Sequence, residues 1–127
     1  MGGDGRKIFL IDMDGTICEN VRNEEGILAM DRARPFIESI NSVNKLHNEG
    51  HFICIFTART DEHKDVTEKW LKRYGVKYHQ VLYNKPRKIG KYTEYHMIDD
   101  TPVRATTYKG RFSGFVKKSI EIDVFED

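Results

Sequence analysis

The sequence has few of the features that mark secreted, membrane-spanning or nucleic-acid-binding proteins. It contains two cysteines in 127 residues, too few for a disulfide scaffold. No apolar run approaches the roughly 20 residues that a membrane-spanning helix needs. Residues 1–5 are polar and glycine-rich, unlike a secretory leader. The 21 basic residues are balanced by 20 acidic ones, so net charge gives no indication of nucleic-acid or membrane binding. We therefore expect a cytoplasmic protein that binds neither.

The length predicts one domain over residues 1–127, with residues 1–5 as a loose tail. A chain of this size can bury a sizeable core without staples. Cys54 lies inside an apolar run and is expected to be a reduced core residue. Residues 17–33 are polar and mixed, with no clear period, and are expected to form a loop or short flap.

Apolar runs and helical spacing alternate along the rest of the chain. The predicted strands cover residues 7–12, 51–57, 80–83 and 96–99, and the predicted helices cover 35–49, 61–74 and, briefly, 86–92. The four consecutive apolar residues 8–11 predict a strand buried on both faces. Alternating residues at 120–124 predict a half-exposed fifth strand. This order predicts an α/β fold, a Rossmann-like parallel sheet flanked by helices.

Polar residues follow these apolar strands where ligands bind in open parallel sheets. Asp12 and Asp14 come directly after the first strand, Thr57 after the second, and Asp99 after the fourth. Because the carboxyl ends of parallel strands meet at one edge, we expect these side chains to converge. Two carboxylates this close repel unless a positive group lies between them. A divalent cation is the usual solution.

These residues resemble the four motifs of the haloacid dehalogenase (HAD) superfamily phosphohydrolases. The matching stretches, in order, are Asp12-x-Asp14-Gly15-Thr16, Thr57, Lys85 and Asp99-Asp100. The resemblance covers about residues 7–104, and the lack of a long insertion after Thr16 is similar to the small capless members, with 17–33 in place of a cap. Phe56-Thr57-Ala58-Arg59 and Ile98-Asp99-Asp100 are most similar to the capsule-biosynthesis-type phosphatases.

The resemblance implies a magnesium-dependent phosphatase that acts on a phosphate monoester. Asp12 would attack phosphorus and form an aspartyl-phosphate, which splits hydrolysis into two easier steps. Asp14 would be the general acid and then the general base. Mg²⁺ would be held by Asp12, by the Asp14 backbone carbonyl and by the Asp99-Asp100 pair, with Asp100 as the direct ligand and Asp99 either outer or also coordinating.

Thr57 and Lys85 complete the implied catalytic set. Thr57 would offer its hydroxyl and backbone N–H to a phosphoryl oxygen, although a threonine alone is more often a helix cap or turn residue. Lys85 would neutralise the aspartate and phosphoryl charges, although most lysines are surface residues. Arg32, Arg34 and Arg59 flank the expected mouth, where a guanidinium suits a second phosphate or carboxylate of the substrate. Ordinary surface arginines are the alternative.

Two other functions remain open from the sequence. A receiver-like signalling module also gathers acids, a threonine and a lysine around magnesium, but its phosphorylated aspartate ends the third strand, where this chain has Tyr83-Asn84. A nucleic-acid end phosphatase is weakly suggested by residues 69–93, which hold eight basic residues and no acid. The preferred substrate is a small phosphate ester such as a phospho-sugar. The site is expected to be open unless a neighbouring subunit of a homo-oligomer covers it.

Overall fold

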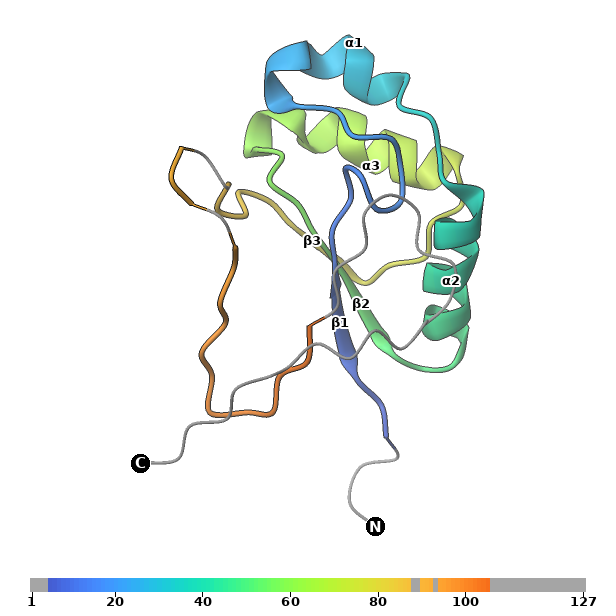
Figure 1. Ribbon diagram of the computed structural model, residues 1–127. Helices are drawn as coiled ribbons and strands as arrows, with labels where there is room; N and C mark the ends of the chain where they lie inside the picture. Colours follow the sequence, from blue (N-terminus) through green and yellow to red (C-terminus); the bar gives the residue numbers. More distant parts are fainter. Residues whose placement is uncertain (1–4, 88–89, 93, 106–127) are drawn as a thin grey trace.

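The fold is an α/β, Rossmann-like parallel sheet flanked by helices (Figure 1). The computed structural model describes residues 5–87, 90–92 and 94–105. The strands are β1 (Ile8–Ile11), β2 (Phe52–Phe56) and β3 (Gln80–Leu82), in the order β1-β2-β3. The helices are α1 (Gly26–Asp31), α2 (Ile37–Asn48) and α3 (Lys64–Arg73), with 3-10 turns at Asn23–Glu25 and Asp61–His63.

The register fixes which strand residues share a face of the sheet. Ile11 pairs with Ile55, which pairs with Val81. Alternate side chains of a strand point to opposite faces, so these three residues lie on one face. Ile11 and Ile55 belong to the buried core, and Val81 packs against it. This face is the one that the helices cover.

Helices α2 and α3 present apolar stripes to that face. Ile40, Val43 and Leu46 of α2 are buried at the three- and four-residue spacing of one helical face. Trp70 and Leu71 of α3 are fully buried. Burying a side chain of this size contributes roughly 1.5–3 kcal/mol. The Trp70 indole also donates a hydrogen bond to the Ala33 carbonyl (2.9 Å), which ties the chain after α1 to α3.

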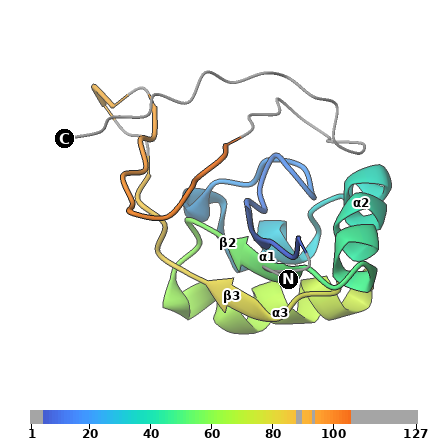
Figure 2. The same cartoon turned by 90° about the horizontal axis from the view of Figure 1, so that it is seen from below.

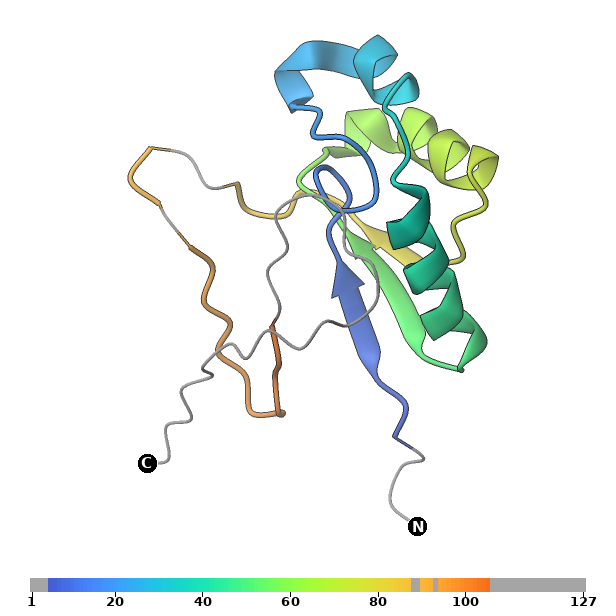
Figure 3. The same ribbon diagram turned by 45° about the vertical axis from the view of Figure 1, so that its right-hand side comes forward.

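The opposite face of the sheet carries no described helix. Figures 2 and 3 show α2 and α3 together on one side, and the segment 94–105 on the other. Ile8 and Leu10 are 72% and 47% exposed. The prediction that β1 is buried on both faces is therefore wrong for the described residues. Both crossovers run in the same direction along the sheet, β1 to β2 to β3, so their helices lie on the same side.

Several predicted elements differ from the structure. Residues 17–33 are not only a loop, because they include α1, which is too short for its period to be recognised in the sequence. Helix α2 begins at Ile37, since Pro35 instead forms an isolated bridge with Cys18. The predicted helix 61–74 is a 3-10 turn followed by α3.

The predictions of a fourth strand at residues 96–99 and of a short helix at residues 86–92 are wrong. Residues 96–99 have no strand partner among the described residues, and Ile98 is 97% exposed. Their apolar content, Met97 and Ile98 alone, is too small to fix a pairing register. The described residues of 86–92 contain a turn and no helix, consistent with the low helix propensity of Gly90. The predicted strand at 120–124 and most of the tail at 1–5 lie outside the described residues.

In the described part of the chain, no helix has both the length and the apolar character needed to cross a membrane. Between β1 and α2, the chain contains a 3-10 turn and a six-residue helix. No cap domain is formed by these residues.

Candidate active site

Three of the four predicted motifs meet at the carboxyl edge of the sheet. Asp12 follows β1, Thr57 follows β2, and Lys85 lies three residues after β3. Backbone hydrogen bonds join the last two loops: Thr57 N–H donates to the Leu82 carbonyl (2.9 Å), and Lys85 N–H donates to the Thr57 carbonyl (3.0 Å). The end of β3 is therefore held against the end of β2, which brings Lys85 toward Asp12.

Asp12 is a half-exposed carboxylate beside a lysine. Its Oδ1 accepts the Met13 N–H (2.9 Å) and lies 4.0 Å from Lys85 Nζ. Its Oδ2 has no hydrogen bond within the described residues. Partial burial raises the pKa of Asp12, the Lys85 charge and the Met13 N–H lower it, and the neighbouring Asp14 charge raises it further. The raised pKa shows that burial outweighs the single lysine.

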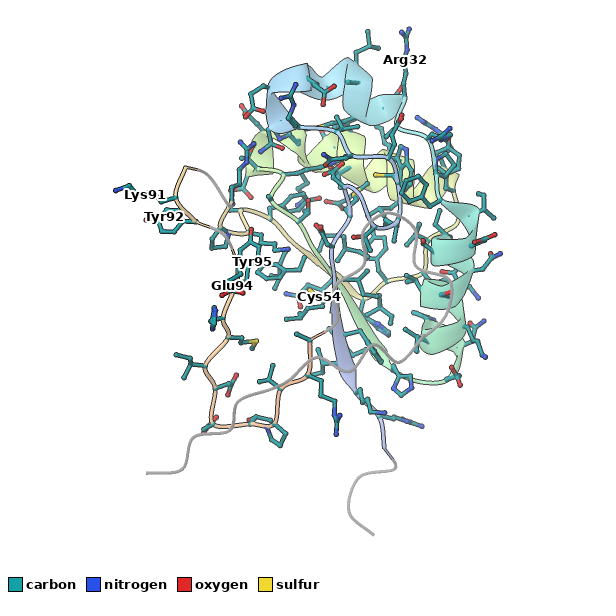
Figure 4. All side chains as sticks on the ribbon, viewed as in Figure 1. Arg32, Cys54, Lys91, Tyr92, Glu94 and Tyr95 are labelled. Carbon is teal, nitrogen blue, oxygen red and sulfur yellow. The ribbon has the colours of Figure 1, made fainter. Side chains whose placement is uncertain are left out.

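Lys85 is held in position by aromatic rings as well as by charge. Its Nζ lies 5.6 Å from the Phe56 ring centroid and 4.8 Å from that of Tyr95. Both distances are within the range of cation–π attraction. The Tyr95 hydroxyl donates a hydrogen bond to the Pro86 carbonyl, and Tyr95 is labelled in Figure 4. No sequence pattern indicated Tyr95, since nothing in its neighbourhood places it near residue 85.

A tight turn carries the chain from Asp12 to Cys18. The Met13 carbonyl accepts hydrogen bonds from the N–H groups of Thr16 (3.0 Å) and Ile17 (2.9 Å). Gly15 has a φ of 83°, which favours glycine. The Met13 side chain is fully buried, so the two acids on either side of it project toward the edge of the sheet.

Asp14 is bound by Arg59 in a two-pronged ion pair. Arg59 Nε donates to Asp14 Oδ2 (3.0 Å), and Arg59 Nη2 donates to Asp14 Oδ1 (2.8 Å). The Arg59 side chain is 0% exposed and that of Asp14 is 15% exposed. Bidentate guanidinium–carboxylate pairs are among the strongest hydrogen-bonded contacts in proteins.

Cys18 adds a third donor to the Asp14 carboxylate. Its Sγ lies 3.6 Å from Asp14 Oδ1, and burial raises the thiol pKa, with the Asp14 charge as the next cause. The thiol therefore stays neutral and can donate. Sequence reasoning missed both contacts of Asp14, because they depend on how the loops after β1 and β2 pack.

The structure corrects the predicted roles of Arg59 and of the Thr57 backbone. Arg59 was expected to face the substrate, but it is buried and its guanidinium is occupied by Asp14 and Thr67. The Thr57 N–H was expected to bind a phosphoryl oxygen, but it already donates to Leu82. The buried Thr57 hydroxyl oxygen accepts the Arg59 N–H (3.1 Å), so only its O–H proton can serve another acceptor.

Arg32 and Arg34 lie apart from these contacts. Arg32 caps the end of α1, and Figure 4 shows it directed outward from the end of that helix. Arg34 is exposed, and its backbone exchanges hydrogen bonds with Glu19, which accepts the Arg34 N–H through Oε1 (2.9 Å) and donates its own N–H to the Arg34 carbonyl (2.9 Å). No side-chain contact joins either arginine to Asp12 or Asp14 in the described residues.

The fourth motif is not brought to the site. Asp99 and Asp100 are exposed, on a segment that runs down the side of the sheet toward the end where β1 begins (Figures 1 and 3). Their acceptors are used locally: Thr101 N–H donates to Asp99 (3.1 Å), and the Thr101 hydroxyl contacts Asp100 (3.4 Å). The predicted convergence of all four motifs is therefore wrong in this structure, because residues 96–99 form no strand beside β1.

The donor set does not by itself form a magnesium site. Among residues 5–87, 90–92 and 94–105, no three acidic, histidine or cysteine side chains gather as metal ligands. Asp12 offers one carboxylate, whereas the Asp14 carboxylate is taken up by Arg59. Magnesium prefers an octahedral set of oxygens, part of it from water and substrate. The side chains in place supply too few of these oxygens to hold the ion by themselves.

Comparisons with known proteins support the fold and carry no functional name. Neither the protein-family models nor the curated proteins gave a match. Among solved structures, the chain is similar to the crystal structure of a structural-genomics (MCSG) target from Vibrio cholerae, with 24% identity and a TM-score of 0.55. The similarity covers 77% of this chain and 83% of that one. At this identity it shows a shared fold alone.

Proposed function

We propose that the protein is a HAD-type phosphatase that hydrolyses a small phosphate monoester through an aspartyl-phosphate on Asp12. The observation that carries the proposal is the pairing of Asp12 with Lys85 across two strand ends, with Asp14 two residues away. A carboxylate oxygen, a fixed cation and a second carboxylate at one edge of a parallel sheet supply a nucleophile, charge compensation and a proton carrier. A phospho-sugar or similar metabolite is the proposed substrate class.

The first step joins Asp12 to phosphorus. Asp12 Oδ2 forms the new P–O bond while the bond from phosphorus to the ester oxygen breaks. Asp14, which rests as a carboxylate, first takes the proton carried by the monoanionic form of the ester, and the leaving oxygen then takes that proton from Asp14. For this, one Asp14 oxygen has to exchange its hydrogen bond from Arg59 for that proton. Lys85 stabilises the negative charge that Asp12 and the phosphoryl group bring together.

The second step releases phosphate. Water attacks phosphorus and gives a proton to Asp14, and the P–O bond to Asp12 breaks. Asp14 then passes that proton to the departing phosphate, which restores both carboxylates. Mg²⁺ is the proposed cofactor; when bound, such an ion cancels charge so that an anionic nucleophile can approach an anionic phosphate.

A panel of phosphate esters assayed with Mg²⁺ tests the proposal. Wild-type protein is expected to release phosphate from at least one small ester, with a KM that does not depend on salt, unlike a nucleic-acid substrate. Asp12→Asn is expected to lose turnover by on the order of 10⁴-fold or more, as removal of a covalent nucleophile does. Equal turnover by this variant would reject Asp12 as the nucleophile, and absence of turnover by the wild type on every ester would reject the phosphatase.

A further inference from the structure

A fully buried arginine lies directly behind the proposed proton carrier. Arg59 uses three of its N–H groups: two bind the oxygens of Asp14, and Nη1 donates to the Thr67 hydroxyl (3.0 Å). Thr67 is itself 0% exposed and lies on α3. A polar residue on the apolar stripe of a helix normally has a buried partner, and here that partner is Arg59.

The backbone around Arg59 is fixed from both sides. The Arg59 N–H donates to Thr57 Oγ1 (3.1 Å), and the Arg59 carbonyl accepts the Asn84 N–H (2.8 Å). Asn84 has a φ of 65°, a conformation in which the chain turns sharply after β3. The Arg59 backbone is thus held by the loops after β2 and β3, and its guanidinium is held by α3 through Thr67.

This geometry excludes a direct contact between Arg59 and substrate. The side chain has no exposed surface, and Asp14 and Thr67 occupy the directions in which its fork points. A phosphate could reach the guanidinium only by displacing Asp14. The same contacts fix both oxygens of Asp14 in a plane, since a bidentate pair constrains orientation as well as distance.

We infer that Arg59 is a positioning residue that aligns the Asp14 carboxyl group for proton transfer, and that Thr67 anchors it from α3. The inference rests on the proposed function for its kinetic consequence. Arg59 acts on turnover through Asp14 and takes no part in binding the ester. Misplacement of a catalytic group by about 1 Å costs about 10²-fold in rate. Substitution of Arg59 should therefore lower kcat and leave KM unchanged.

A double-mutant cycle separates alignment from a general structural role. Arg59→Met is expected to lower kcat about 10²-fold in the wild-type background. In the Asp14→Asn background it should cause no further loss, because the group that it aligns is already gone. Equal losses in both backgrounds, or a rise in KM with unchanged kcat, would overturn the inference.

Two further variants guard the experiment. Thr67→Val keeps the ion pair and the helix shape but removes the anchor, so it should lower kcat less than Arg59→Met and again have no effect with Asp14→Asn. If Arg59→Met does not fold, the Thr67→Val cycle decides the question by the same criterion. Arg73→Met is the matched control, because Arg73 makes a similar pair with Asp31 (2.6 Å) on the surface. Its kcat should equal that of the wild type.

A readout that needs no substrate keeps this inference distinct from the proposed function. The Nε–H signal of Arg59 in an NMR spectrum of the wild-type protein should be protected from exchange, and Asp14→Asn should remove that protection. An unprotected signal in the wild type would refute the pairing. A protected signal in a wild-type protein that has no phosphatase activity would instead refute the proposed function. In that case Arg59 would have no Asp14-dependent turnover to support, and the positioning role would fall with it.

Discussion

The two acidic pairs of this chain have similar composition and very different surroundings. Asp12 and Asp14 follow β1 and contact Lys85 and Arg59, which come from the loops after β3 and β2. Asp99 and Asp100 lie on exposed coil, and among the described residues they contact Thr101 and each other. The pKa values move in opposite directions: burial raises that of Asp12, whereas the Thr101 N–H lowers that of Asp99. The partners supplied by other segments, more than the acids themselves, distinguish the surroundings of the two pairs.

The largest expected difference concerns activity. Asp14→Asn should lower kcat on phosphate esters by roughly 10²–10⁴-fold, as loss of a general acid–base does. Asp31→Asn is its control, because Asp31 also binds an arginine but lies on the surface. Steady-state kinetics on the best ester of the panel measure both. Full turnover by Asp14→Asn would remove the chemical distinction between the two pairs.

The free energy of unfolding should distinguish the two acidic pairs almost as clearly as activity does. Arg59→Met leaves a mostly buried carboxylate without its partner, which should lower the free energy of unfolding by about 3 kcal/mol. Asp100→Asn changes an exposed side chain and should stay within about 0.5 kcal/mol of the wild type. Urea unfolding measures both. The double variant Asp14→Asn with Arg59→Met should lose less than the sum of its single changes, and strict additivity would contradict the ion pair.

The dependence of activity on Mg²⁺ tests the contrast between the two acidic pairs. Chelation by EDTA is expected to abolish phosphatase activity, and added Mg²⁺ should restore it. The resemblance to HAD enzymes implies that Asp100 would hold the ion, and in that case Asp100→Asn should raise the Mg²⁺ concentration for half-maximal rate by about 10–100-fold. If the variant had the Mg²⁺ dependence of the wild type, Asp100 would remain in the exposed position described above, and the predicted ligand role would be wrong.

The smallest expected effect is a change in pH dependence. Lys85 lowers a pKa that burial has raised, so Lys85→Met should raise the Asp12 pKa further. The nucleophile must be ionised, and the acid limb of kcat/KM should therefore move to higher pH. With a raised native pKa, the folded state binds the proton more tightly than the unfolded state. The contribution of Asp12 to the free energy of unfolding is therefore present at low pH and is lost as the pH rises through the pKa of the folded state.

Lys77→Met is the control for this measurement. Lys77 belongs to the same basic stretch but contacts Asn48 on the surface (2.9 Å). Its pH profile should match that of the wild type. A profile for Lys85→Met that also matched the wild type would show that the 4.0 Å pair has no electrostatic effect on Asp12.

The sequence predicted the parts of the molecule that depend on local pattern. The apolar runs at β1 and β2 located those strands to within a residue or two at each end. Thr57 was placed at the site because it follows an apolar strand, and parallel strands bring such positions together. Lys85 was placed there by the resemblance to the HAD motifs. In each case the pattern lies within a few residues of the feature that it predicts.

The parts that could not be predicted depend on contacts between distant segments. The Asp14–Arg59 pair joins residues 45 apart, and nothing in either local pattern selects that partner. Thr67 left one signal, a hydroxyl on the buried stripe of α3. The error at residues 96–99 arose because two apolar residues resemble a strand locally, whereas a strand exists only when a neighbour pairs with it.

The ion pairs at the sheet edge have a consequence for charge balance. Two carboxylates and two cations sum to zero, so these four side chains are together electrically neutral at rest. A phosphate monoester carries about 1.5–2 negative charges at neutral pH. Lys85 has one charge to share between Asp12 and the phosphoryl group, and the charge of Arg59 is paired with Asp14. An incoming ester therefore brings an excess of negative charge, which a divalent cation bound together with the ester would reduce.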